Sequence, residues 1–147
     1  MAVTFSYADR KLLLSHKRQI KSFVATVFKE EEEILADLNY VFCSDDFLLD
    51  INKRFLEHDY YTDIITFELS PKDQPLVSDI YISTERVEEN ARLYNSSFKV
   101  ELHRVIFHGA LHLAGYKDKN KEQSLVMRQK EELYLKKYLV PRGTSRH

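Results

Sequence analysis

The segment from His108 to Asp118 contains the residues whose types and spacing best fit a chemical role. His108 and His112 are four residues apart, so on a helix both imidazoles project from one face and can bind the same ion. Gly115 can adopt a left-handed conformation that ends the helix, and the turn that follows can bring Asp118 back toward the two rings. Two histidines, one carboxylate and one open position are typical of a catalytic Zn²⁺. The sequence therefore predicts one Zn²⁺ per chain, held by His108, His112 and Asp118.

The chemistry expected of this site is metal-assisted hydrolysis, with no catalytic group assigned beyond the metal-bound water. Such an ion lowers the pKa of its water toward ~7 and offsets the negative charge that develops in the transition state. The spacing of the site also matches that of metzincin proteases, with Asp118 in place of their last His. Those proteases need a Glu directly after the first His as general base, and here Gly109 occupies that position. Peptide hydrolysis by that mechanism is therefore disfavoured.

Composition bounds the size of the protein and its partners. A chain of 147 residues fits one domain, and we expect residues 1–140 to form it. Lys and Arg number 22 against 23 Asp and Glu, so any binding of nucleic acid must depend on a local patch rather than on overall charge. Residues 141–147 follow a Leu-Val-Pro-Arg-Gly run that resembles a protease-cleavable expression linker but could equally be native, and we expect them to lie outside the domain.

Cysteine usage and hydropathy indicate the compartment. Cys43 is the single cysteine and cannot form an intramolecular disulfide, so we expect it to be a small buried apolar side chain. The first residues lack the pattern of a secretory signal, which favours a cytoplasmic location. No apolar run approaches the ~18 residues of a membrane-spanning helix, so no membrane partner is expected.

Hydrophobic periodicity predicts the secondary structure. Alternating and β-branched runs indicate strands at Val3 to Tyr7, Leu38 to Cys43, Asp63 to Leu69 and Asp79 to Ser83. Helical spacing predicts helices around residues 20–28 and 45–55, and at Thr84 to Tyr94, Phe98 to Ala114 and Lys121 to Tyr138. We therefore predict an α+β fold, in which a small four-stranded mixed sheet packs with about five helices and a metal cleft lies at the helix that carries the histidines.

Three local features near these elements are assigned structural roles. Asn120 fits the N-cap of the last helix, and Gln123 can complete a capping box, which leaves Asp118 free to reach the ion. The acidic run from Glu30 to Glu33 is expected to be a solvated helix end. Asp63 is expected to hold a turn or a strand start through backbone N–H groups.

Residues 108–118 resemble the signature H-G-x-L-H-L-x-G-Y-D-H of the YbeY-type rRNA-maturation endoribonucleases, with agreement at nine of eleven positions. Upstream, Asn52, Asp59, residues 62–67 and residues 78–80 are similar to the family's N…D..TDVLSF and GDI segments. The resemblance implies a single-strand-specific, metal-dependent endoribonuclease that acts in 16S rRNA 3′-end maturation and ribosome quality control. It also implies ribosomal RNA and the small ribosomal subunit as partners.

Three positions depart from the family pattern. Lys117-Asp118 replaces the usual Asp-His, so the third ligand would be a carboxylate. Leu56 stands where the family usually has an Arg associated with substrate handling, and Ser78 replaces a Gly.

We consider three residues as candidates for binding RNA in the cleft. His58 would offer a cation to a phosphate, Arg54 is a candidate to replace the missing Arg, and Tyr116 would stack on a base. Two alternative functions stay open at this point: a metzincin-like metalloprotease, and a non-catalytic ribosome-assembly factor in which zinc staples the helix to the following turn.

Overall fold

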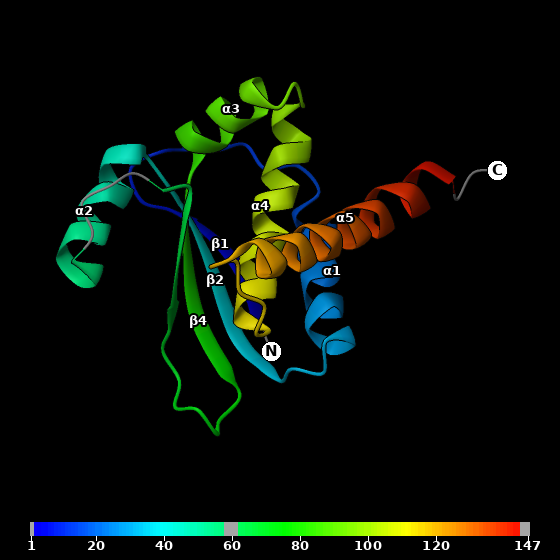
Figure 1. The fold of residues 1–147 in the computed structure, drawn as a ribbon, viewed down its shortest axis with the longest axis horizontal. Helices are drawn as coiled ribbons and strands as arrows, with labels where there is room; N and C mark the ends of the chain where they lie inside the picture. The colour runs from blue at the N-terminus through cyan, green and yellow to red at the C-terminus, as the bar shows by residue number, and fades with distance from the viewer. Residues whose placement is uncertain (1, 58–61, 145–147) are drawn as a thin grey trace.

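The computed structural model describes residues 2–57 and 62–144, and within them it shows a four-stranded sheet packed with five helices (Figure 1). The predicted α+β class is confirmed. Among the described residues, no helix combines the length and the apolar character needed to cross a bilayer. The elements in chain order are β1 (Ala2–Tyr7), α1 (Lys17–Glu30), β2 (Leu35–Cys43), α2 (Asp45–Leu56), β3 (Ile64–Glu68), β4 (Leu76–Ser83), α3 (Thr84–Leu93), α4 (Phe98–Leu113) and α5 (Lys121–Thr144).

The sheet is mixed, and β3 forms one of its edges. The strand order is β1-β2-β4-β3, with β1, β2 and β4 parallel and β3 antiparallel to β4. Both β2 and β4 begin earlier than predicted, because Leu35 and Leu76 pair with each other across the sheet. The sequence pattern concealed this pairing, since each strand start follows charged or proline-containing segments that read as loop.

Different helices pack on the two faces of the sheet. Tyr40, Phe42, Ile80 and Ile82 are fully buried on the face that carries the main core. Because side chains alternate along a strand, Cys43 lies on the opposite face, against α2. Figure 1 shows α2 on one side of the sheet and α1, α4 and α5 on the other. Burial, with smaller contributions from nearby carboxylates, raises the pKa of the Cys43 thiol to about 12, so it is an apolar side chain as predicted.

Helix α4 is the central helix and packs directly on the sheet. It contacts α1, α3, α5 and β3, and between Glu101 and Leu113 it is buried except at Arg104, His108 and His112. Gly109 faces the sheet, where a Cβ atom would lie 2.9 Å from Ile64 Cδ1 and within about 3 Å of Ile80. The absence of a side chain at this position therefore lets the helix axis approach β3 and β4 closely.

The helix ends as the sequence predicts. Gly115 has a φ of +108°, and the Tyr116 N–H donates to the Leu111 carbonyl at 3.0 Å, which closes the last turn. Asn120 caps α5 by accepting from the Gln123 N–H at 2.8 Å. The Gln123 side chain accepts from the Lys119 N–H rather than from that of Asn120. The capping residue is thus confirmed, with the return bond shifted by one residue.

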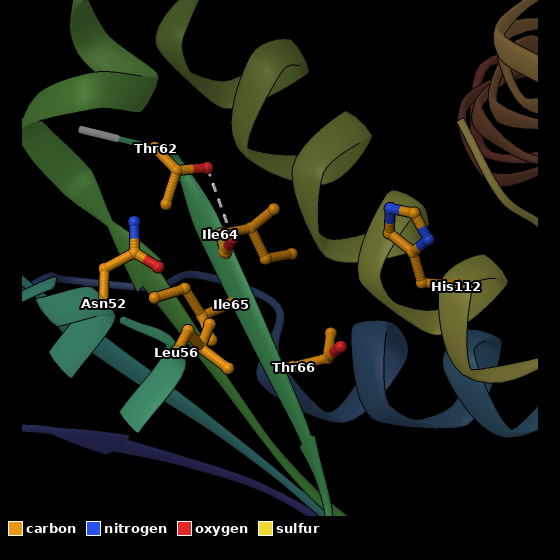
Figure 2. Close-up of a pocket in the computed structure, with 7 residues that line it drawn as sticks. All are labelled: Asn52, Leu56, Thr62, Ile64, Ile65, Thr66 and His112. Carbon is orange, nitrogen blue, oxygen red and sulfur yellow. Dashed lines mark hydrogen bonds between the residues drawn. The ribbon is translucent and has the colours of Figure 1, made fainter. Parts of the chain in front are cut away.

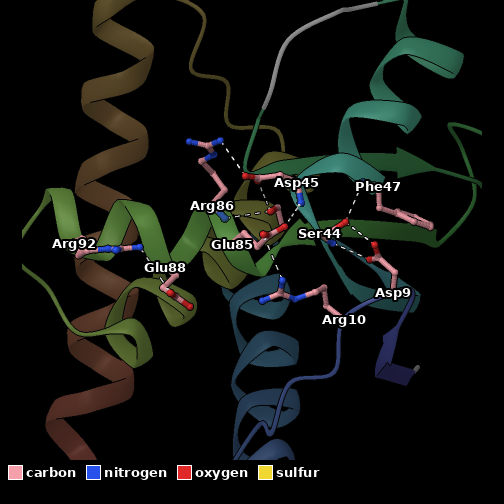
Figure 3. Close-up of polar contacts among 10 residues, drawn as sticks. Asp9, Arg10, Ser44, Asp45, Phe47, Glu85, Arg86, Glu88 and Arg92 are labelled. Atoms are coloured by element: carbon pink, nitrogen blue, oxygen red, sulfur yellow. Dashed lines mark hydrogen bonds and ion pairs between the residues drawn. The ribbon is translucent and has the colours of Figure 1, made fainter.

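A polar network joins the starts of α2 and α3 at the end of the sheet (Figure 3). The Ser44 hydroxyl caps α2 and donates to Asp9 at 2.5 Å. The Ser83 hydroxyl caps α3 and donates at 2.6 Å to Asp45, which also accepts from Arg86 at 3.1 Å. The two helices therefore share one set of hydrogen bonds where their strands end.

Helix α5 continues to Thr144, past the predicted end at Tyr138. It includes Pro141, a residue that ordinarily ends or kinks a helix, and it enters the segment that the sequence set apart as a tail because of its likeness to an expression linker. The helical backbone thus extends into this tail, and the division at residue 140 stays a prediction.

The acidic run was expected to be solvated, and this expectation is wrong for Glu31. Its side chain is only 11% exposed and accepts hydrogen bonds from the hydroxyls of Tyr116 and Tyr134 and from Lys130. These donors lie in the turn after α4 and on α5, so one carboxylate joins α1 to both. Burial alone would raise the pKa of Glu31, but the hydrogen bonds from Tyr134, Tyr116 and Lys130 outweigh it and hold the pKa below its usual value.

We predict that Glu31→Gln lowers the free energy of unfolding by about 1.5–3 kcal/mol at pH 7, since hydrogen bonds to a charged acceptor are lost. Because the pKa of Glu31 is depressed in the folded state, its contribution is present above the unfolded pKa of ~4.3 and is lost as the pH falls through the folded pKa. Denaturant unfolding between pH 7 and pH 2 should therefore show the difference between the two proteins shrinking in acid.

The control is Glu30→Gln, which removes a carboxylate that is 38% exposed and paired with Lys137 at 2.7 Å. A surface ion pair of this kind is worth about 0–1 kcal/mol. Equal losses in the two variants would contradict the role assigned to Glu31.

Candidate metal centre

The structure brings together the three residues that the sequence predicted as metal ligands. His108 and His112 lie on the partly exposed stripe of α4, with their ring centroids 4.5 Å apart. Asp118 returns from the turn after Gly115, and its Oδ2 lies 3.5 Å from the Nε2 of each ring. The ligand atoms of the three residues all lie within 4.8 Å of one another. This group could hold a metal ion.

Two of the three separations between ligand atoms match a tetrahedral ion. Two ligands about 2.1 Å from a tetrahedral Zn²⁺ are separated by roughly 3.4 Å. The observed separation of 3.5 Å between each Nε2 and the Asp118 oxygen therefore needs almost no adjustment. The side chains of His108, His112 and Asp118 are 18%, 26% and 42% exposed, so the group opens to solvent on one side. That opening leaves room for a fourth, exchangeable ligand.

Hydrogen bonds on the far side of each ring orient the two histidines. His112 Nδ1 lies 3.0 Å from the Tyr116 carbonyl, which can only accept, so Nδ1 donates and Nε2 keeps its lone pair. His108 Nδ1 is hydrogen-bonded to the carboxylate of Glu131 on α5. Both rings therefore present an unprotonated Nε2 toward Asp118 when they are neutral.

The surroundings of His108 are negatively charged. Burial lowers the pKa of His108, but the hydrogen bond and charge of Glu131 and the charges of Asp63 and Asp118 outweigh this effect, so the pKa is raised. Asp63 has a raised pKa, mainly because it is buried, with His108 acting in the opposite direction. The site thus attracts positive charge.

Sequence reasoning missed the proximity of Glu131 and Asp63 to the metal group. Asp63 directly precedes β3, and its carboxylate is hydrogen-bonded to its own backbone N–H, as expected for a strand start, but its charge also acts on His108. The one sequence feature that could have placed Asp63 near the metal group is its position in the segment that resembles the family pattern. No sequence feature could have placed Glu131 there, because its contact with His108 depends on how α5 packs against α4.

A groove of about 270 Å³ lies beside His112 and follows the edge strand β3. Figure 2 shows Asn52 and Leu56 of α2 on one side of the strand and His112 on the other. The remaining lining residues are Thr62, Ile64, Ile65 and Thr66. Leu56, which occupies the position of the expected family Arg, therefore lies in the groove that leads to the metal group.

The candidates for substrate binding have other positions. His58 lies outside the described residues. Arg54 is 68% exposed, pairs with Asp50 at 3.3 Å and lines a separate groove with Phe55 and other aromatic residues. The Tyr116 hydroxyl donates to Glu31 at 2.7 Å, which gives this ring a structural contact. Within the described part of the chain, neither Arg54 nor Tyr116 lines the groove beside His112.

His103 lies away from the metal group, as its position on the helix predicts. Its side chain is 2% exposed, and its ring stacks on Phe107 and meets Tyr138 edge-on. It is therefore part of the core between α4 and α5.

Comparisons with known proteins point to one family. A family model described as "Endoribonuclease YbeY" matches residues 5–139. Relatives with the same name include one from Cytophaga hutchinsonii, 46% identical over 133 residues that make up 90% of this chain and 93% of the relative. Another, from Bacteroides thetaiotaomicron, is 38% identical over 131 residues, 89% of this chain and 95% of the relative.

A solved structure gives the same result for the fold. The solution structure of a Thermotoga maritima protein superposes with a TM-score of 0.65 at 28% identity, covering 98% of this chain and 93% of that one. The family match runs from within β1 into α5 and so includes each element that carries the metal group. The chain belongs to the YbeY family.

Proposed function

We propose that the protein is a zinc-dependent endoribonuclease that cleaves single-stranded RNA. The observation that carries this proposal is the convergence of His108 Nε2, His112 Nε2 and Asp118 Oδ2 beside an open groove. Two imidazoles and one carboxylate suit Zn²⁺, and a zinc ion bound there supplies Lewis-acid chemistry and water activation for phosphodiester hydrolysis. The names of its relatives support RNA as the substrate.

The edge strand β3 offers donors for an RNA backbone. Asp63 and Leu69 direct their backbone groups toward β4, as their hydrogen bonds to Ser83 and Val77 show. In an antiparallel pair every second residue points the other way, so Ile64 and Thr66 turn their N–H groups to the outer edge. Backbone N–H groups bind phosphate oxygens without reading sequence. An RNA strand lying along β3 would therefore pass His112.

The cellular role follows from membership of the family. We propose that the substrate is ribosomal RNA on the small ribosomal subunit, in 16S rRNA 3′-end maturation and quality control, and that the protein acts in the cytoplasm. Residues 1–140 would form the single catalytic domain. The near-zero net charge of the whole chain favours recognition of a local RNA site over general binding of nucleic acid.

The packing of Gly109 argues against a metalloprotease. A side chain at this position would point at Ile64 and Ile80 in the sheet and not toward the metal group. The position therefore lacks a general base and also has no room for one.

We predict that His108→Ala and His112→Ala abolish both zinc binding and RNA cleavage while the protein stays folded. Asp118→Ala should lose zinc affinity by orders of magnitude, Asp118→Asn should keep part of it through its carbonyl oxygen, and Asp118→His should keep zinc. Bound zinc per chain and cleavage of a single-stranded RNA are the measurements. The control, Asn120→Ala, removes the α5 cap and should cost about 1 kcal/mol of stability with full zinc occupancy.

The same samples separate the proposal from a structural zinc. If metal removal unfolds the protein and reconstituted protein cleaves no RNA, the ion is a staple and the proposed activity is wrong. Full zinc occupancy in Asp118→Ala would exclude Asp118 as a ligand.

We predict that Leu56→Arg increases kcat/KM for RNA by roughly tenfold, since a cation in the groove gains a charge-assisted hydrogen bond to phosphate. The salt dependence of log(kcat/KM) should steepen by about 0.7, the value for one added phosphate contact on a single strand. The control is Leu69→Arg, which adds the same charge to the separate groove. Equal effects of the two variants would show that overall charge, and not the groove at His112, governs RNA binding.

A further inference from the structure

Glu131 is a buried carboxylate that touches one of the metal ligands from a different helix. It is 6% exposed, lies on α5, and accepts a hydrogen bond from His108 Nδ1 through Oε2. A buried carboxylate is costly unless its charge is compensated. The groups that surround Glu131 must therefore compensate its charge.

The second oxygen of Glu131 forms a long ion pair with an arginine. Arg104 Nη1 lies 3.7 Å from Glu131 Oε1, and the Arg104 side chain is only 15% exposed. Arg104 also pairs with Glu101 at 3.7 Å and with Glu132. Arg104 and His108 are one turn apart on α4, so Glu131 lies between a hydrogen-bond donor and a second positive charge on the same side of that helix. The ion pair with Arg104 compensates part of its charge.

The two histidines differ in what supports them. His112 donates its Nδ1–H to the neutral carbonyl of Tyr116, whereas His108 donates to an anion. An anionic acceptor fixes the tautomer and makes the opposite nitrogen a stronger ligand. The structure thus gives His108 a support that His112 lacks.

We propose that Glu131 is a positioning residue for the metal centre. It accepts a hydrogen bond from the Nδ1–H of His108, holds the ring in the tautomer whose Nε2 is unprotonated, and strengthens the bond from that nitrogen to the ion. Arg104 in turn compensates part of the charge of Glu131. The inference rests on the proposed metal function, and it adds a residue of α5 to a site formed by α4 and the turn after it.

The test compares zinc affinity in Glu131→Gln, Glu131→Ala and the control Glu101→Gln. Glu101 is also 6% exposed and pairs with Arg104, so its variant reports the cost of disturbing the arginine alone. Competition with a chelator should show zinc binding weakened about 10–100-fold in both Glu131 variants, the usual cost of losing such a partner. Glu101→Gln should stay close to the wild type. If Glu131→Ala fails to fold, Glu131→Gln, which keeps the shape of the side chain, decides the matter.

A second readout uses metal-free protein labelled with ¹⁵N-histidine, at a pH where the imidazoles are neutral. Long-range ¹H–¹⁵N correlations should show His108 as the Nδ1–H tautomer in the wild type and a mixture of tautomers in Glu131→Ala. Unchanged zinc affinity and an unchanged tautomer in the Glu131 variants would overturn the inference, as would an equal loss in Glu101→Gln. Failure of the wild type itself to bind zinc would instead overturn the proposed metal centre.

Discussion

The contact of Gly109 with the sheet determines the rest of the architecture. A side chain there would collide with Ile64 and Ile80, so the glycine is what allows α4 to lie against β3 and β4. Because α4 packs this closely on the sheet, its partly exposed side, which carries His108 and His112, borders the edge strand β3. The groove beside His112 then forms between α4 and α2. The flanks of α4 are then free for α1 and α5, which bring Glu31 to the turn before Asp118 and Glu131 to His108. Fold and site thus share one close packing contact.

Electrostatics explains why such a site needs a cation. Asp118 and Glu131 contact the histidine pair directly, and Asp63 acts on His108 through its charge. The raised pKa of His108 reflects the same excess of negative charge. Arg104 offsets part of it on the side away from the groove. A divalent ion at the converging ligand atoms would neutralise the rest, and its open position would face the groove in which we propose that a phosphodiester binds.

The sequence predicted the metal group because each feature that forms it involves residues close together in the chain. The four-residue spacing of the histidines, the positive φ of Gly115 and the cap at Asn120 depend on a few neighbouring residues, and the structure contains all three. Glu31 and Glu131 were missed because their roles come from helix packing between distant segments. Arg54 was expected near the metal group, but it lies two residues from both Asn52 and Leu56. Residues two apart on a helix point in different directions, which takes Arg54 to another groove.

The most direct test of the central claim is a crystal structure of the zinc-loaded protein with anomalous data at the zinc edge. Our account predicts one strong peak about 2.0–2.2 Å from His108 Nε2, His112 Nε2 and an oxygen of Asp118, with a non-protein fourth ligand toward the groove along β3. A peak ligated through the Nδ1 atoms, a fourth ligand supplied by the protein, or zinc bound away from these three residues would contradict it.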